Sequence, residues 1–335
     1  MCNDSAILIT GTGNNSLGEM ICKTLRRAYT GTPIIAIDLN NSSLITNLER
    51  TLAFNINLNP LTHHAGYKGV ANDVQQVIDN ARSQFQFHGI GMVVLAAGMY
   101  DFGDLTSTSL DVRQAITGVN VCGKIEILHA VMEMNNKFGF RSEEELTLVD
   151  IGSLHGLSAS GSRAIYVASK AFGLDLCLSL LHGHEINRMI HFAPGPIDTH
   201  MLHRNHWVLK EHGSSEFFEY VREKHAEKYS NVFVGCDDQE FAKMVTGFSE
   251  NNEVLFNIFN RYKERRARQM AGDNPILNPM DVATVIVDTL QHPTSEEEVV
   301  CKINAAGGHV QTQMLSIDQV IRFQVASKQR KSDRP

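Results

Sequence analysis

The stretch SAILITGTGNNSLGEM, residues 5–20, joins an apolar run to a glycine-rich turn and then to an amphipathic segment. A short apolar run that ends at glycine is typical of a buried strand, and the residues after Ser16 have helical spacing. Small residues at such a turn let the backbone approach a pyrophosphate, and the helix N-terminus supplies free N–H groups. The stretch therefore predicts the first strand, turn and helix of a dinucleotide-binding sheet, although a plain turn between a strand and a helix also favours Gly and Asn.

An acidic residue, Asp38, ends the next apolar run, TPIIAIDL at 32–39. It lies 38 − 18 = 20 residues after Gly18, where dinucleotide-binding folds place an acid that bonds the adenosine ribose. A carboxylate there repels the extra phosphate of NADP, and residues 12–17 contain no Arg or Lys to bind that phosphate. The spacing favours NAD as the cofactor; the alternative is an aspartate that merely ends a strand.

Strand-like and helix-like segments alternate as far as residue 195. Their alternation predicts an α/β fold, a doubly wound parallel sheet of about seven strands with helices on both faces. Residues 200–278 are richer in charge and in aromatic residues such as Trp207 and Tyr220, and read mostly as helix. We expect one domain over 1–335, with a helical insert at 200–278 and a polar tail at 327–335. The expected strands lie at 5–11, 32–39, 51–58, 91–98, 146–153, 188–195 and 298–308.

Composition limits the classes of partner. The 335 residues are 43% hydrophobic and 20% charged, with a net charge of −7. This balance argues against a nucleic acid or an acidic membrane surface as the main partner. The longest near-apolar run, GIGMVVLAAGMY at 89–100, is too short to span a bilayer. No basic segment precedes the first strand, and the six cysteines form no CxxC pair, so we expect free thiols in a reducing cytoplasm.

The segment AIYVASKAF, residues 164–172, places Tyr166 and Lys170 one helical turn apart on the same face. Such a pair can lie at the edge of a buried face with its polar ends in water. Alternatively, the ammonium favours the phenolate: a free phenol has a pKa near 10, and a cation about 4 Å away contributes about 4 kcal/mol at an effective dielectric near 20. Ser153 lies 166 − 153 = 13 residues earlier, at the carboxyl end of the fifth expected strand.

The chain resembles the short-chain dehydrogenases/reductases in several motifs that occur in that family's order. The resemblance implies a Rossmann-like fold, with Tyr166 as general acid/base and Lys170 binding the nicotinamide ribose and lowering the pKa of Tyr166. It also implies that Ser153 holds the substrate oxygen and that Asn120 completes a proton relay; the alternative for Asn120 is a cap or packing role. His155, close after Ser153, is expected to touch substrate. The matching motifs are TGTGNNSLG, Asp38, LAAG (95–98), Asn120, Ser153, YVASK (166–170) and PGPIDT (194–199).

The same resemblance implies a set of cofactor-binding residues. They lie in the glycine loop, after the second and fourth strands, in the Tyr-Lys helix and after the sixth strand. The residues are Gly11, Asn15, Ser16, Leu17, Gly18, Asp38, Ala97, Gly98, Tyr166, Lys170, Pro196, Ile197 and Thr199.

The sequence also departs from the family pattern. The glycine loop is one residue longer than usual, with Ser16 where a glycine is common. Leu95-Ala96-Ala97-Gly98 replaces the usual Asn-Asn-Ala-Gly, and Asn55 or Asn57 replaces an acid after the third strand. These departures affect contacts to the cofactor more than the reacting groups.

The leading hypothesis is an NAD(H)-dependent oxidoreductase that interconverts a secondary alcohol and a ketone. A long aromatic lid at 200–278 suggests a bulky substrate, and the family resemblance suggests a homodimer or homotetramer. Two alternatives stay open: a catalytically silent dinucleotide sensor or scaffold, and a sugar-nucleotide epimerase or dehydratase, whose Ser-to-Tyr separation is generally wider. We expect no metal, because His200, His203 and His206 lack an accompanying acidic or cysteine cluster.

Overall fold

The computed structural model describes most of the chain outside the expected lid. The described residues are 4–62, 69–100, 105, 108–157, 164–197, 199, 277–292, 298–306, 309–316 and 319–320. Apart from Leu277 and Asn278, the predicted insert at 200–278 lies outside them. So do the tail at 327–335 and the three histidines His200, His203 and His206.

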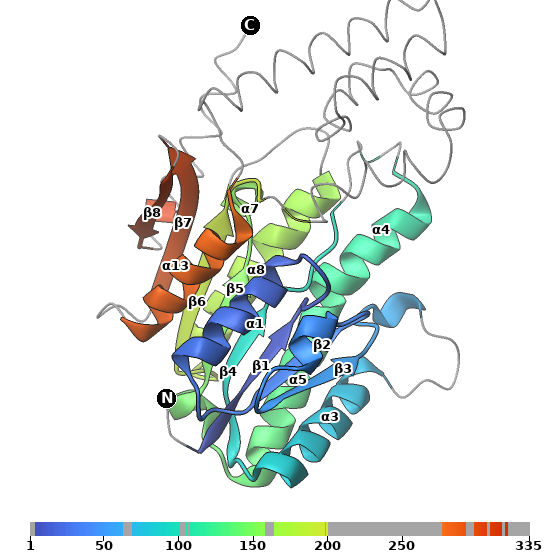
Figure 1. Cartoon of the computed structure of the whole chain (residues 1–335). Helices are drawn as coiled ribbons and strands as arrows, with labels where there is room; N and C mark the ends of the chain where they lie inside the picture. Colours follow the sequence, from blue (N-terminus) through green and yellow to red (C-terminus); the bar gives the residue numbers. More distant parts are fainter. Residues whose placement is uncertain are drawn as a thin grey trace, which may run out of the picture.

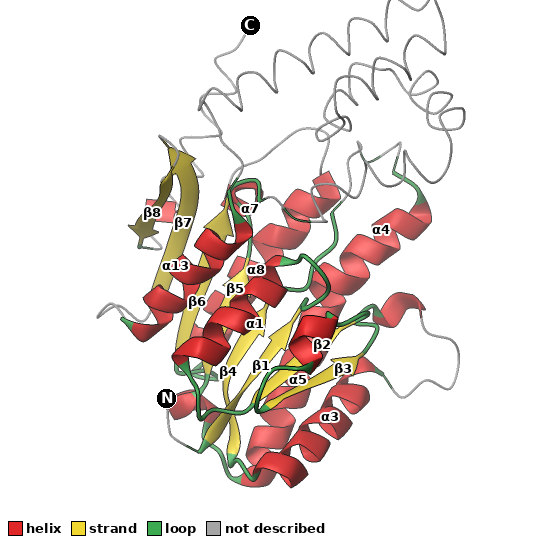
Figure 2. Cartoon of the chain, viewed as in Figure 1, coloured by secondary structure: helices red, strands yellow, loops and turns green. Residues whose placement is uncertain are grey.

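The described strands form a single mostly parallel sheet (Figure 2). They are β1 (Ser5–Thr10), β2 (Ile34–Asp38), β3 (Thr51–Asn55), β4 (Gly89–Leu95), β5 (Thr147–Ile151), β6 (Arg188–Pro194), β7 (Glu298–Ala306) and β8 (His309–Leu315). Their order is β3-β2-β1-β4-β5-β6-β7-β8, and only β8 runs antiparallel, against β7. The predicted doubly wound, Rossmann-like α/β class is confirmed, and the sheet has one strand more than the seven expected.

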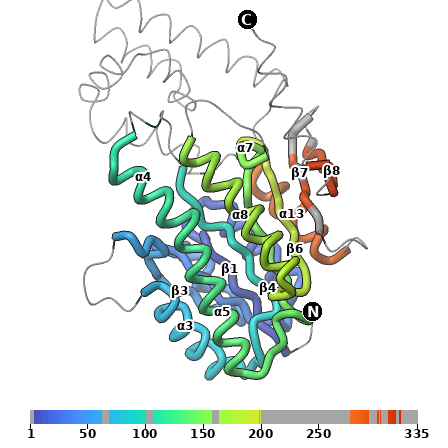
Figure 3. Tube along the Cα trace, turned by 180° about the vertical axis from the view of Figure 1, so that it is seen from behind, coloured from blue at the N-terminus to red at the C-terminus, as the bar shows by residue number. Residues whose placement is uncertain are grey.

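Two layers of helices cover the sheet. On one face lie α1 (Leu17–Ala28) and α13 (Pro279–Gln291), as Figure 1 shows. On the other lie α3 (Val70–Phe85), α5 (Gly123–Phe138) and α8 (Ala164–His182), seen in Figure 3. Strands buried on both sides need apolar residues throughout, which is why β1 and β4 read as continuous apolar runs. The shorter helices are α2 (Ser43–Thr46), η1 (Pro60–Thr62), α4 (Leu110–Thr117), η2 (Gly118–Cys122), α6 (Ser142–Glu145) and α7 (Leu154–Leu157).

The strand order reverses between β1 and β4, because β2 and β3 lie on one side of β1 and all later strands on the other. Parallel strands end at the same edge of the sheet, so the residues after β1, β4, β5 and β6 meet there. Open α/β sheets bind ligands outside the carboxyl ends of the strands at such a reversal. The fold therefore brings the glycine loop, Ala97, Ser153 and the segment after Pro194 to one edge.

Two helical segments within the described residues have the length and composition of a membrane span. They are Leu110–Phe138, with a mean hydropathy of 1.2, and Ala164–His182, with 1.5. Both belong to the layer that packs on the sheet, through α5 and α8. Apolar helices of this kind are expected in the core of a doubly wound fold.

Candidate functional site

Tyr166 and Lys170 lie together on α8, as their spacing predicts. Both side chains are inside the protein, with 8% of Tyr166 and 4% of Lys170 exposed. The Nζ of Lys170 lies 5.8 Å from the centre of the Tyr166 ring and donates a hydrogen bond of 2.9 Å to the carbonyl oxygen of Ile151. The ammonium is thus held by the end of β5 and does not reach water, which rules out the snorkelling alternative for Lys170.

The environment of Lys170 lowers its pKa to about 7. Burial is the largest cause, because the charged form loses its hydration. The positive charge of Lys124 lowers the pKa further, and Asp150 partly opposes both effects. Lys170 therefore changes charge near neutral pH, whereas an exposed lysine stays protonated there.

Residues in and just before α7, and one after β4, bring further side chains toward Tyr166. The Oγ of Ser153 accepts a hydrogen bond of 3.2 Å from the backbone N–H of His155. The His155 ring lies 6.4 Å from the Tyr166 ring, edge to face, and the Tyr100 ring lies 4.7 Å away in the same type of contact. The predicted substrate residues His155 and Tyr166 are thus neighbours, and Ser153 lies in the turn that leads from β5 to them. Tyr100 was not expected at this position.

Asn120 lies in η2, a single π-turn between α4 and α5. Its side chain accepts a hydrogen bond of 2.7 Å from the N–H of Met99 and donates one of 2.8 Å to the carbonyl of the same residue. It also donates to the Oγ of Ser169 at 2.9 Å, and that hydroxyl donates to the carbonyl of Tyr166. The amide thus ties the segment after β4 to α8, and its part in a proton relay stays a prediction.

The glycine loop is shaped by close backbone approaches. Gly11 has φ of +78°, and a Cβ there would lie 2.5 Å from the backbone nitrogen of Ala97. A Cβ on Gly18 would lie 2.2 Å from the carbonyl oxygen of Gly11. Only glycine fits at these two positions, so the start of α1 packs directly on the turn after β1. The predicted residues Gly11, Gly18 and Ala97 are therefore brought together.

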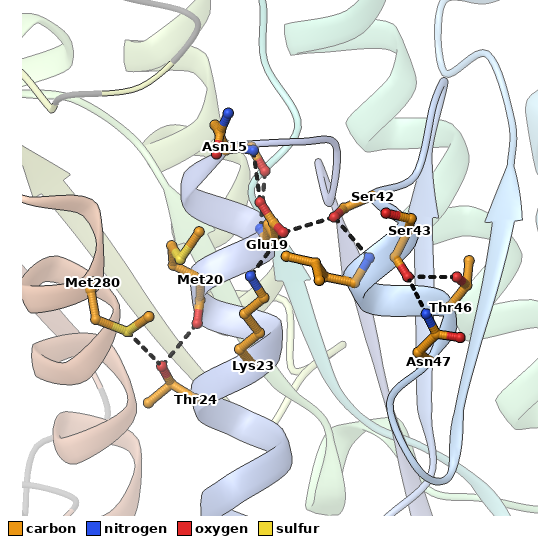
Figure 4. Close-up of polar contacts among 12 residues, drawn as sticks. Asn15, Glu19, Met20, Lys23, Thr24, Ser42, Ser43, Thr46, Asn47 and Met280 are labelled. Carbon is orange, nitrogen blue, oxygen red and sulfur yellow. Dashed lines mark hydrogen bonds and ion pairs between the residues drawn. The ribbon is translucent and has the colours of Figure 1, made fainter.

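A buried carboxylate, Glu19, lies at the same helix N-terminus (Figure 4). It accepts hydrogen bonds from the backbone N–H of Asn15 at 2.7 Å, from the hydroxyl of Ser42 at 2.7 Å and from Lys23 at 2.9 Å. Burial raises the pKa of Glu19, but the bonds from Lys23, Ser42 and Asn15 outweigh it, so the pKa lies below its ordinary value. The residue stays an anion where a pyrophosphate is expected.

The sequence itself contains a signal for the position of Glu19 at the start of α1. Ser16 and Glu19 match the S-x-x-E pattern of a capping box. In the structure the Oγ of Ser16 accepts from the N–H of Glu19 at 3.0 Å and donates to the carbonyl of Gly11 at 2.7 Å. The extra loop residue, Asn15, takes the left-handed conformation with φ of +54°. Ser16 in place of a glycine therefore serves to cap α1.

Asp38 faces the glycine loop from the end of β2. Its carboxylate accepts hydrogen bonds from the backbone N–H groups of Gly13, Leu39 and Asn40, the last at 2.9 Å. Burial raises the pKa of Asp38, and these three bonds offset the rise only in part. Gly13 also forms an isolated bridge with Asn41, so the loops after β1 and β2 are joined. Asp38 thus lies beside the loop, and a ribose hydroxyl that bonded its carboxylate would do so alongside the backbone N–H groups that already donate to it.

The remaining predicted cofactor residues lie after β4 and β6. The N–H of Ala97 donates to the hydroxyl of Thr10 at 3.1 Å, which fixes the turn after β4 against β1. Ile197 pairs with Leu277, and the carbonyl of Pro196 accepts from the N–H of Leu277 at 2.8 Å. Thr199 donates to the carbonyl of Ile197 at 2.9 Å. This segment therefore lies beside the start of α13, at the strand edge that carries the other site residues.

Within the described residues, no group of three or more His, Cys, Asp or Glu side chains could hold a metal ion. The three histidines considered above lie outside those residues. The part of the site that the structure describes therefore consists of protein hydroxyl, amine, amide and carboxylate groups.

Comparison with known proteins gives a consistent result. Residues 5–207 match the family model described as short chain dehydrogenase. Among solved structures, a short-chain dehydrogenase from Streptomyces avermitilis is 14% identical with a TM-score of 0.57, covering 99% of this chain and 95% of its own. An NAD complex of a short-chain dehydrogenase/reductase from Burkholderia phymatum is 16% identical with a TM-score of 0.55, covering 87% and 88%. An NAD+-bound xylitol dehydrogenase is 19% identical with a TM-score of 0.52, covering 86% and 92%.

Because the sequence identities are low, these structural similarities show only that the fold is shared. Among curated proteins, none matches the chain in sequence.

Proposed function

The chain belongs to the short-chain dehydrogenase family, and from this premise we propose that it is an NAD(H)-dependent oxidoreductase that interconverts a secondary alcohol and a ketone. One observation carries the proposal: Tyr166 lies beside the buried amine of Lys170, and that amine is fixed by the carbonyl of Ile151 at the end of β5. Tyr166 would act as the general acid/base, and Ser153 and His155 would contact the substrate oxygen from the adjoining turn.

The electrostatic contribution of Lys170 follows from its distance. At 5.8 Å from the ring centre and an effective dielectric near 20, an ammonium stabilises a phenolate by about 3 kcal/mol. That corresponds to roughly a hundredfold increase in the ratio of phenolate to phenol. The effect requires Lys170 to be protonated, and with a pKa of about 7 about half of it is protonated at neutral pH and nearly all of it below. A bound nicotinamide would supply the hydride acceptor or donor.

The proposed cofactor is NAD. Gly11 and Gly18 leave room for a close backbone approach, and Asp38 offers a carboxylate beside the glycine loop. Asp38 and the buried Glu19 are both anions on the adenosine side of the site, and both would repel a further phosphate on the ribose. Lys170, with the backbone of residues 195–199, would hold the nicotinamide end.

The test is a paired measurement of binding and turnover. NADH binding is followed by nicotinamide fluorescence, and turnover by NADH absorbance with a panel of bulky secondary alcohols and ketones. The informative variant is Tyr166→Phe, and the matched control is Tyr29→Phe, which removes a hydroxyl at the end of α1, away from α8. We expect all three proteins to bind NADH and only Tyr166→Phe to lose turnover. Full turnover by Tyr166→Phe contradicts the role assigned to that phenol.

A second candidate is a dinucleotide sensor or scaffold without turnover. It is favoured by the buried Glu19, which occupies the helix N-terminus with a negative charge, and by the apolar Leu95 at the end of β4 and Ala96 after it. The same measurement separates the two candidates. Binding of NADH by the wild type without turnover of any panel compound supports the sensor.

We also propose that the protein is a homo-oligomer in the cytoplasm that acts on a bulky substrate. Two exposed apolar side chains, Leu110 on α4 and Ile125 on α5, support an oligomer because they flank the turn that carries Asn120. Light scattering of the full chain, compared with the double variant Leu110→Ser and Ile125→Ser, tests this surface. A wild type that is monomeric at micromolar concentration contradicts it.

A further inference from the structure

Three ionisable side chains form a closed cluster beneath the candidate site. Asp150 on β5 and His191 on β6 are direct neighbours in the sheet register. One carboxylate oxygen of Asp150 contacts the Nζ of Lys124 on α5, and the other lies 2.8 Å from the Nδ1 of His191. All three side chains are almost completely buried. Groups of this kind are rarely buried without a partner or a role.

The cluster touches both segments that carry the reacting groups. Gly173 lies on α8 one turn after Lys170, and a Cβ there would be 2.7 Å from both Asp150 and Lys124. Gly152 immediately precedes Ser153, and a Cβ there would be 2.2 Å from the His191 ring. Because these two glycines have no side chain, the backbones of α8 and of the end of β5 pack directly against the charged groups. A change in the cluster is therefore transmitted to Lys170 and to Ser153 without an intervening layer.

The cluster also sets the electrostatic environment of Lys170. The ionisable groups that act on that amine are Lys124 from α5 and Asp150 from β5, and the Tyr166 phenol lies beside it on α8 itself. Asp150 in turn contacts His191 from β6 and acts on Cys177 from α8. Burial raises the pKa of Cys177, and the charge of Asp150 raises it further, so the thiol stays neutral. Burial also raises the pKa of Asp150, but Lys124 and then His191 outweigh it and hold the pKa well below its ordinary value.

Lys124 and Asp150 therefore act on Lys170 with opposite sign. The positive charge of Lys124 lowers the pKa of Lys170, and the negative charge of Asp150 raises it. Burial sets the lowered pKa of Lys170 in the first place, and because Asp150 is an anion throughout the physiological range, the balance between the two charges adjusts how much of Lys170 is protonated near neutral pH.

We propose that Lys124 and Asp150, the latter held by His191, are positioning residues that control the charge of Lys170, and through it the pH range in which Tyr166 exchanges protons. The inference deepens the proposed function and rests on it for the activity readout. The titration of Lys170 itself can be measured in the absence of any substrate.

The first test compares pH profiles of kcat/KM for the wild type, Lys124→Met and Asp150→Asn. Loss of the Lys124 charge should move the alkaline limb up by about one pH unit, and loss of the Asp150 charge should move it down by about as much. The double variant should return close to the wild type. The matched control is Lys137→Met, the same substitution on α5 at an exposed lysine paired with Asp79, and its profile should not move. Profiles that keep their shape while activity falls in both single variants would overturn the inference, because that pattern shows a structural role only.

The second test separates this inference from the proposed function. Lysine side chains are labelled with 13C, and the Lys170 signal is identified by its disappearance in Lys170→Met. The signal should titrate near pH 7 in the wild type, higher in Lys124→Met and lower in Asp150→Asn. If the wild type turns over no compound but these shifts appear, the proposed function fails and the charge control stands. If Asp150→Asn does not fold, the double variant is compared with Lys124→Met and should titrate lower. A Lys170 signal that titrates at the same pH in all folded variants overturns the inference.

Discussion

Replacing Lys170 by methionine is expected to make the stability of the cofactor-free protein less dependent on pH. The pKa of Lys170 falls from an ordinary value of 10.5 to about 7 in the folded protein, chiefly through burial. Between these values the unfolded chain holds a proton that the native protein lacks, so the stability of the wild type rises with pH. The cost of burying the ammonium is complete below the folded pKa and disappears above the unfolded one.

The size of the effect follows from the width of this window. Each pH unit well inside it changes the free energy of unfolding by about 1.4 kcal/mol. From pH 7, where the native amine is half protonated, to pH 9 the gain is about 2 kcal/mol. The buried thiols also contribute near pH 9, and their contribution cancels in the comparison with Lys170→Met because both proteins carry them. Burial raises the pKa of Cys22 and of Cys301 to about 12, so each favours the unfolded state once its thiol ionises above its ordinary value of 9.0.

Urea unfolding at pH 7, 8 and 9 measures this contribution. The wild type is compared with Lys170→Met and with Lys137→Met, which removes the same charge from an exposed position on α5. We expect the stability difference between the wild type and Lys170→Met to change by about 2 kcal/mol in favour of the wild type as the pH rises to 9. Lys137→Met should follow the wild type. A difference that stays constant within about 0.5 kcal/mol shows that Lys170 keeps its proton over the whole range, and refutes the reasoning.

Three other substitutions test the site. Glu19→Gln should tighten NADH binding roughly fivefold, because a carboxylate at a helix N-terminus that must accept a second anion costs about 1 kcal/mol. The control is Glu133→Gln at an exposed position, and equal NADH affinities of Glu19→Gln and the wild type would contradict this. Asp38→Asn should raise the preference for NADP relative to NAD by roughly tenfold in competition binding, about 1.4 kcal/mol of relieved repulsion. Asn120→Ala should lower the free energy of unfolding by about 3 kcal/mol, since three hydrogen bonds are lost; a loss below about 1 kcal/mol in urea unfolding would show that water replaces them.

The individual strands and the Tyr-Lys pair could be predicted from the sequence because each depends on residues close together in the chain. A continuous apolar run such as β4 has few other structures available, and a spacing of four residues places Tyr166 and Lys170 on one helical face. Part of the turn after β1 was predictable for the same reason, since Gly18 packs on Gly11, seven residues earlier; the close approach of Gly11 to Ala97 depends on the fold. The capping box of Ser16 and Glu19 was also within reach of the sequence.

Features that depend on contacts between distant segments could not be predicted. Lys124, Asp150 and His191 come from three different elements, and each reads in the sequence as an ordinary polar residue. The bonds from Asn120 to Met99 and Ser169 require the fold to bring the residues together. Strand β8 was missed because its sequence, HVQTQML, is largely polar and exposed and has no regular run of apolar residues. Such a sequence resembles a loop when no partner strand is known.

The antiparallel pairing of β8 changes what the sheet presents at its end. β7, whose described side chains Val300, Cys301 and Ile303 are buried, has its outer row of backbone groups bonded over seven register positions within the same chain. The terminal strand of the sheet is instead one with Gln311, Thr312 and Gln313 exposed. A polar terminal strand is a poor template for uncontrolled ladder formation between copies. Within the described residues, a contact between copies at this edge would therefore involve mainly amide and hydroxyl side chains, with Met314 as the one exposed apolar side chain of the strand.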